Sequence, residues 1–228
     1  MSEDINNRYN EYINFLKQYN KLGFKFIPLR GKRPYWEGWS NPEKWFSGEY
    51  SNQKSAQEIL TKNTNVGVLT GDVSKIVAID VDQPYILGYN PNYAIKKGAL
   101  AHTTSKAPRL IIYSDNLEVL AFSKKLTKKW TELTEEEKEK AIGKEEIERT
   151  YEELKEKFER GEISEEEFKR KIPVVTIIEI LGNGRQFVAP PSIHPEKGIK
   201  FEWITRSYAP RFRGIKIILC LNLNFKIW

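Results

Sequence analysis

The sequence predicts an α+β (or α/β) fold in which strands outnumber helices. Short apolar runs rich in Val and Ile recur along the chain, and Gly, Pro or polar residues bound each of them. Only a few segments carry the spacing of three and four residues between apolar side chains that is typical of amphipathic helices. Strands mixed with few helices are expected to pack as a sheet that helices cover.

The first helix is expected from Tyr9 to Leu22. Apolar side chains recur there at helical spacing, and Gly23 follows as a stop signal; they are Tyr12, Ile13, Phe15, Leu16 and Tyr19. The remaining elements of the main domain are short and are separated by turn residues. A short helix is expected at 55–60, and strands are expected at 24–29, 65–69, 75–81, 109–113, 174–181, 186–189 and 200–204.

The segment 124–172 differs in composition, with 14 Lys or Arg and 16 Asp or Glu. Thr134 with Glu137, and Ser164 with Glu167, have the spacing of helix-starting capping boxes. We therefore predict an inserted, charged helical hairpin. It is either a solvated insertion that covers its own apolar stripe or a docking and oligomerisation arm. The stripe consists of Ile147, Tyr151, Leu154 and Phe158.

Composition excludes several classes of protein. The single Cys220 rules out a disulfide framework and a multi-cysteine zinc site. No run approaches the roughly 20 apolar residues of a membrane span, and the polar start is no secretory signal, so we expect a cytoplasmic protein that does not involve a membrane. The net charge is +6, and residues outside 124–172 include 23 basic and 15 acidic ones. This surplus suits a polyanion such as nucleic acid, or it simply keeps a Lys-rich protein soluble.

Two aspartates end the most apolar of the predicted strands, in the run KIVAIDVD. Because side chains alternate along a strand, Asp80 and Asp82 project from one face, about 7 Å apart along the strand. Such carboxylates repel one another unless a cation lies between them. The pair is therefore either a site for a hard divalent cation such as Mg²⁺ or a solvated pair at a strand end.

Glu179 is a third candidate, in the aliphatic strand IIEIL. A carboxylate among aliphatic residues is costly to bury unless it is paired or bound to metal. The alternative is the exposed face of an edge strand. Together with Asp80 and Asp82, it would complete the minimum set of acids for two-metal phosphoryl transfer.

Five stretches in a fixed order carry a family resemblance. They are GFKFIPLRGKRPYWEGW, NVGVLTG, IVAIDVD, TTSKAPRLIIY and IEILGNGRQFVAPPSIHPEKGIKFEW. The ordered set resembles the Prim-Pol group of the archaeo-eukaryotic primase superfamily, the DNA primase/polymerase domains of plasmids, viruses and prophages.

The resemblance implies a primase-polymerase fold with an N-terminal αβ unit and an RRM-like sheet unit. The catalytic domain would comprise 1–123 and 173–210, interrupted by the insertion 124–172, with an atypical tail at 211–228. The implied activity is template-directed nucleotidyl transfer that depends on Mg²⁺ or Mn²⁺ at a two-metal site, in the replication of a mobile element. The implied partners are a single-stranded DNA template and primer, nucleoside triphosphates and a replication helicase acting in trans.

The resemblance also implies residue roles. Arg109 stands where the family usually has a phosphate-binding His, and an Arg can hold phosphate with two hydrogen bonds. His102 lies seven residues earlier, either as a substitute ligand or as an ordinary surface residue, and His194 is expected to be structural. The implied catalytic metal ligands are Asp80, Asp82 and Glu179, and the implied nucleotide-binding residues are Arg109, Lys32, Ser105 and Arg185.

Two other functions remain open from the sequence. One is a catalytically degenerate, primase-like DNA-binding replication factor, which the replaced His favours. The other is a basic α/β binding module with a helical docking arm. The aromatic residues Tyr35, Trp36 and Trp39 lie among basic ones and either stack on template bases or pack their loop onto the core.

Overall fold

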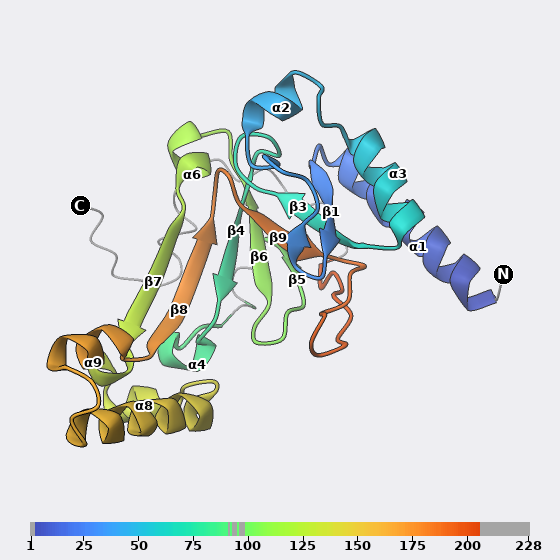
Figure 1. Ribbon diagram of the computed structural model, residues 1–228. Coiled ribbons are helices and arrows are strands. Elements are labelled where there is room, and N and C mark those ends of the chain that lie inside the picture. Colours follow the sequence, from blue (N-terminus) through green and yellow to red (C-terminus); the bar gives the residue numbers. More distant parts are fainter. Residues whose placement is uncertain (1–2, 91, 93–94, 96–98, 206–228) are drawn as a thin grey trace.

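Two antiparallel sheets form the frame of the computed structural model, which describes residues 3–90, 92, 95 and 99–205 (Figure 1). The first sheet has the strand order β2-β1-β3-β9 and the second the order β5-β6-β4-β8-β7. The strands are β1 (Phe26–Arg30), β2 (Arg33–Pro34), β3 (Asn65–Leu69), β4 (Ile76–Val81), β5 (Leu100–His102), β6 (Arg109–Tyr113), β7 (Lys124–Lys129), β8 (Val174–Leu181) and β9 (Gln186–Ala189).

Helices lie against the first sheet and at the ends of the second (Figure 1). This combination confirms the predicted α+β class. None of the described helices is long and apolar enough to cross a membrane. The helices are α1 (Glu3–Lys21), α2 (Pro42–Phe46), α3 (Asn52–Lys62), α4 (Pro84–Leu87), α6 (Leu117–Ala121), α7 (Glu135–Glu139), α8 (Lys144–Glu159) and α9 (Glu165–Lys171), with a 3₁₀ turn at Trp130–Glu132.

A single hydrophobic core joins the two sheets. Helix α1 contributes Tyr12, Leu16 and Tyr19, three of the five apolar residues of the predicted helix, while Ile13 and Phe15 are only partly buried. The first sheet contributes Phe187 among others, and the second contributes Ala78. One face of the second sheet is therefore covered by the first sheet and α1, and a separate apolar cluster packs on its other face.

The two connections between the sheets lie side by side. One runs from β3 to β4 and the other from β8 to β9. The Thr70 hydroxyl donates to the carbonyl of Gly182 over 2.6 Å, and the Asn183 side-chain amide donates to the Asp72 carboxylate over 3.0 Å. The motifs NVGVLTG and ILGNGR thus meet each other, and their side chains fix how one sheet leads into the other.

The insertion is attached to the second sheet. Its first six residues form β7, the edge strand beside β8, so the helical part begins later than the predicted boundary at 124. Thr134 forms the predicted capping box with Glu137, and Ser164 caps α9. An apolar cluster anchors the hairpin, with Ile147, Tyr151 and Phe168 packing against the buried residues Trp130, Leu133, Ala141, Ile172, Val175 and Ile177.

Two predictions differ from the structure near the end of the described chain. The predicted strand at 200–204 is reduced to single bridges, between Ile193 and Lys200 and between His102 and Trp203. The alternation of apolar and polar residues there predicted a strand. In the structure, each of these two positions pairs with a single residue of another segment instead of with a continuous strand. The tail at 211–228 lies outside the described residues.

We predict that Gly182→Ala strongly destabilises the fold. A Cβ atom at Gly182 would lie within 2.5 Å of the Leu120 carbonyl oxygen and closer still to that of Phe122, and both are backbone atoms that cannot easily move. The expected loss is about 3 kcal/mol of unfolding free energy, measured by urea denaturation. The control is Gly48→Ala, where φ is +81° but no atom lies within 4 Å, and its cost is about 1 kcal/mol. Equal losses in both variants would contradict the steric account.

Candidate active site

A row of charged side chains crosses the second sheet. The pairing of β4 with β8 places Asp80 opposite Glu179, and the pairing of β7 with β8 places Lys125 opposite Glu179. Continuing the register of β4 and β6, in which Ile79 faces Leu110, brings Arg109 beside Asp80. Directly opposed residues of antiparallel strands share a face, with Cβ atoms about 5 Å apart. The row lies on the face that packs toward the first sheet, since Ala78 on that face belongs to the shared core.

Two ion pairs hold the aspartates. The Arg109 guanidinium pairs with the Asp80 carboxylate, and these side chains are only 12% and 21% exposed. The Lys106 ammonium lies 2.6 Å from Asp82, which is itself 20% exposed. Partial burial makes such charge-assisted contacts stronger than ordinary surface ion pairs. The β5–β6 hairpin therefore supplies a cation to each aspartate of the IDVD motif.

Glu179 is placed differently from the two aspartates. It sits in mid-strand and is partly buried, between Asp80 on one side and Lys125 on the other. Within the described residues, its carboxylate forms no hydrogen bond or ion pair. Two neighbouring carboxylates that lack a shared cation repel each other, so Glu179 is the acid of the row that has the most to gain from an added cation.

Arg109 is held at the junction of the two sheets. Its guanidinium lies over the Phe187 ring, 5.6 Å from the centroid, and its Nε atom is buried without a partner among the described residues. The His102 ring stacks on the same Phe187 at 5.3 Å, with Trp203 edge-on at 5.4 Å. The aromatic face keeps the planar guanidinium in position, and one of its terminal nitrogens donates to Asp80.

His102 is buried, so the expectation of a surface histidine is wrong. It is completely enclosed, and its Nδ1 atom lies 2.8 Å from the Thr103 carbonyl. Burial, together with the nearby charge of Arg109, lowers the pKa of His102 to about 3. A neutral, enclosed imidazole cannot replace the family's phosphate-binding His. No local pattern indicated this burial, because the aromatic residues around His102 come from distant segments.

The other predicted nucleotide ligands lie around the row rather than in it. Ser105 sits beside Lys106 in the β5–β6 loop. Lys32 and Arg185 are exposed, and the Lys32 carbonyl accepts a hydrogen bond from Gln186, the residue after Arg185. No hydrogen bond or ion pair in the described chain links Lys32 or Arg185 to the acidic side chains. His194 is structural, as expected, because its ring accepts the backbone N–H groups of Glu196 and Lys197.

The acidic residues suit a divalent cation in chemistry and in register. Carboxylate oxygens are the ligands of Mg²⁺ and Mn²⁺. Asp80 and Glu179 face each other across β4 and β8, and Asp82 lies in the bend directly after β4. However, no three Asp, Glu, His or Cys side chains of the described residues gather closely enough to hold a metal ion. The carboxylates of Asp80 and Asp82 instead face Arg109 and Lys106.

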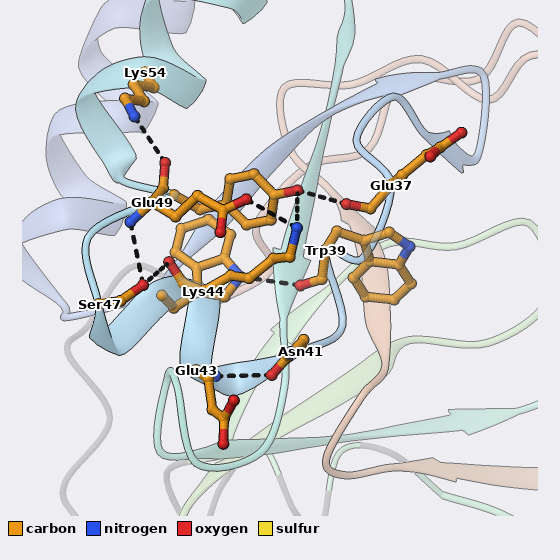
Figure 2. Close-up of polar contacts among 10 residues, drawn as sticks. Glu37, Trp39, Asn41, Glu43, Lys44, Ser47, Glu49 and Lys54 are labelled. Carbon is orange, nitrogen blue, oxygen red and sulfur yellow. Dashed lines mark hydrogen bonds and ion pairs between the residues drawn. The ribbon is translucent and has the colours of Figure 1, made fainter.

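The aromatic loop after β1 mostly packs on itself. Trp36 stacks on Tyr50 with 4.7 Å between ring centroids, and Trp45 donates through its indole to the Trp39 carbonyl over 3.0 Å. Figure 2 shows that the surrounding polar contacts include the pair of Lys44 with Glu49 and a hydrogen bond from Lys54 of α3 to the Glu49 carbonyl, so they tie the loop to α2 and α3. These contacts favour the packing role for the loop's tryptophans. Tyr35 lies instead between the cations of Arg30 and Lys62.

Sequence reasoning missed several residues of the site. The chain has many lysines, so residue type alone did not distinguish Lys106 and Lys125. Lys106 is distinguished by its ion pair with Asp82, and Lys125 by its position opposite Glu179. Phe187 looked like an ordinary core residue. Tyr89 lies near Asp80, and its pKa is raised by burial and by that carboxylate.

The fold and the site together define an α+β protein whose acidic and basic side chains meet between two sheets. Residues 16–213 match the Prim-Pol family, the N-terminal domain of bifunctional DNA primase/polymerases, and the chain belongs to this family. Membership implies DNA primase/polymerase activity in general, of the nucleotidyltransferase type, with DNA and nucleotides as substrates. No curated protein matches the chain.

The low pKa of His102 predicts a loss of stability in acid. The unfolded chain takes up a proton on this His near pH 6.5, whereas the folded chain does so only near pH 3. Stability is therefore lost as pH falls from about 6.5 toward 3, by about 2 kcal/mol between pH 6.5 and pH 5. In His102→Phe this part of the loss should vanish. Urea denaturation at both pH values tests it, and an unchanged pH dependence in the variant would refute the assignment.

Proposed function

We propose that this chain catalyses template-directed nucleotidyl transfer. A primer 3′-hydroxyl would attack the α-phosphate of a nucleoside triphosphate and release pyrophosphate. The observation that carries the proposal is the strand register, which aligns Arg109, Asp80 and Glu179 on one face of adjacent strands. Membership of the Prim-Pol family supports the same reaction.

Asp80, Asp82 and Glu179 would hold two Mg²⁺ or Mn²⁺ ions. When bound, such ions activate the attacking oxygen and neutralise charge on the leaving pyrophosphate. Arg109 would bind triphosphate oxygens, positioned by Phe187 beneath it. Ser105, Lys32 and Arg185 would contact the nucleotide or the template strand. Catalysis would come mainly from positioning and charge neutralisation.

The proposed setting is the replication of a plasmid, virus or other mobile element. Single-stranded DNA with a primer would be the substrate, and a helicase would act in trans. The excess of basic residues outside 124–172 favours a polyanionic partner. The chemistry needs no membrane.

One observation favours a second function, a catalytically degenerate replication factor that binds DNA without extending it. In the described residues, the acidic side chains do not gather into a metal-binding group, and two of them are paired with cations. Such a factor would bind single-stranded DNA in a salt-sensitive manner without divalent metal.

Primer extension separates these two functions. We predict extension of a primed single-stranded template with Mg²⁺ or Mn²⁺, and a loss of at least about a thousandfold in the Asp80→Ala/Asp82→Ala double variant, because its metal ligands are removed. The matched control is Asp115→Ala, an exposed acid just beyond the other end of β6, which should keep full activity. Full activity in the double variant would end the metal assignment, and no extension by the unaltered chain would favour the DNA-binding factor.

Arg109→Ala should raise the apparent KM for the nucleotide about tenfold, because a charge-assisted hydrogen bond to phosphate is lost. Steady-state extension at varied nucleotide concentration measures this change. Arg109→Lys should recover part of it, since Lys keeps the charge without the planar fork. An unchanged KM in the Ala variant would remove Arg109 from the nucleotide site.

A further inference from the structure

We propose that Gln83 is a positioning residue through which the inserted hairpin holds Asp82 in place. Its side chain links the turn between α7 and α8 of the insertion to the bend that carries Asp82. The inference rests on the proposed function, in which Asp82 is one of the acids of the active site, and it gives the insertion a part in that site.

The first support is the pairing of the Gln83 carboxamide. Gln83 is only 4% exposed, and both polar ends of its side chain hydrogen-bond to the backbone of Ile142. The Oε1 atom accepts the Ile142 N–H over 2.7 Å, and the Nε2 atom donates to the Ile142 carbonyl over 3.2 Å. A buried amide needs such partners, because an amide left unpaired in the interior costs free energy. The Gln83 side chain therefore holds the α7–α8 turn much as the backbone of a neighbouring strand would.

The second support is the contact on the other side of the bend. The backbone N–H groups of Asp82 and Gln83 both donate to the Ile177 carbonyl of β8, over 3.0 and 3.1 Å. The bend is thus bonded to the second sheet through its backbone and to the insertion through the Gln83 side chain. The Asp82 carboxylate pairs with Lys106, whose side chain is 36% exposed. Because an exposed ion pair orders a side chain only weakly, the contacts of the bend set where Asp82 lies.

The third support is the apolar packing next to the bend. Gln83 is followed directly by α4, whose Ile86 and Leu87 pack on the apolar cluster that anchors the insertion. Ala141, the neighbour of Ile142, belongs to the same cluster. Figure 1 shows α4 between the end of the second sheet and the helices of the insertion. The contact of Gln83 with Ile142 therefore lies beside apolar side chains and away from water, where hydrogen bonds are stronger.

These contacts give the insertion a role that differs from the two left open by its sequence. Neither a solvated hairpin nor a docking arm requires a bond to the bend after β4. Through Gln83, a displacement of the α7–α8 turn passes to Asp82, the adjacent residue. Small displacements of an active-site group cost much of the rate, so the insertion should affect turnover although it carries none of the three acids of the proposed site.

Gln83→Met tests the link, because methionine has a similar length and volume but no carboxamide. NMR-detected hydrogen exchange of the full chain reports on the bend without relying on activity. The amide of Asp82 should exchange about tenfold faster in the variant, since the insertion no longer holds the bend. In primer extension, kcat should fall about tenfold, while the apparent KM for the nucleotide changes less than about twofold.

The control is Ser164→Ala, which removes the hydrogen bond of 3.2 Å that Ser164 accepts from the Glu167 N–H at the start of α9. This change weakens a helix of the insertion but keeps the contact of Gln83 with Ile142, so neither kcat nor exchange at Asp82 should change. Gln83→Asn is a second test in case the Met variant does not fold. It keeps the carboxamide on a side chain that is one methylene shorter, and it should give the same changes as the Met variant.

Two results would overturn the proposal. One is unchanged exchange of the Asp82 amide in Gln83→Met, which would show that the sheet alone holds the bend. The other is an equal fall of kcat in Ser164→Ala, which would assign the effect to the general stability of the insertion. If the unaltered chain extends no primer, the proposed function fails, and the exchange measurement still decides whether Gln83 holds the bend.

Discussion

The antiparallel register of β4 with its neighbours β6 and β8 is the constraint on which the rest of the site depends. It sets Asp80 between Arg109 and Glu179, and Asp82 follows in the bend directly after β4. A slip of one residue would turn these side chains to the opposite face. The apolar residues between them, such as Ile79 and Val81, fix the register because they must remain buried.

The packing of the two sheets against each other determines which side chains surround the row of charged residues on β6, β4 and β8. Phe187 comes from the first sheet but supports Arg109 and His102 of the second. The connection from β8 to β9 leads to Phe187, and its Gly182 carbonyl accepts a hydrogen bond from the Thr70 hydroxyl of the β3–β4 connection. Packing between the sheets therefore fixes the position of the guanidinium.

Much of the frame could be predicted because local signals were strong. The strands at 65–69, 109–113, 174–181 and 186–189 have the predicted bounds, since each is a short apolar run between turn residues. β7 was not predicted, because the sequence KKLTKK has a single apolar residue and so lacks the alternation typical of a strand. That residue, Leu126, packs inward.

The site was predicted only in part, for a physical reason. Residue type and spacing singled out the three acids, and the family resemblance singled out Arg109. The burial of His102 depends on aromatic residues far away in sequence, and the pairing of Lys106 with Asp82 depends on how β5, β6 and β4 lie together. The described structure also pairs the aspartates with side-chain cations, an outcome that no local pattern indicates.

Crystallography with Mn²⁺ and a non-hydrolysable nucleoside triphosphate tests the central claim most directly. The anomalous signal of manganese locates the ions independently of how the side chains are built. The account predicts manganese between Asp80, Asp82 and Glu179, with Arg109 turned to the phosphates. Manganese bound elsewhere, with both ion pairs of the aspartates intact beside a bound nucleotide, would contradict it.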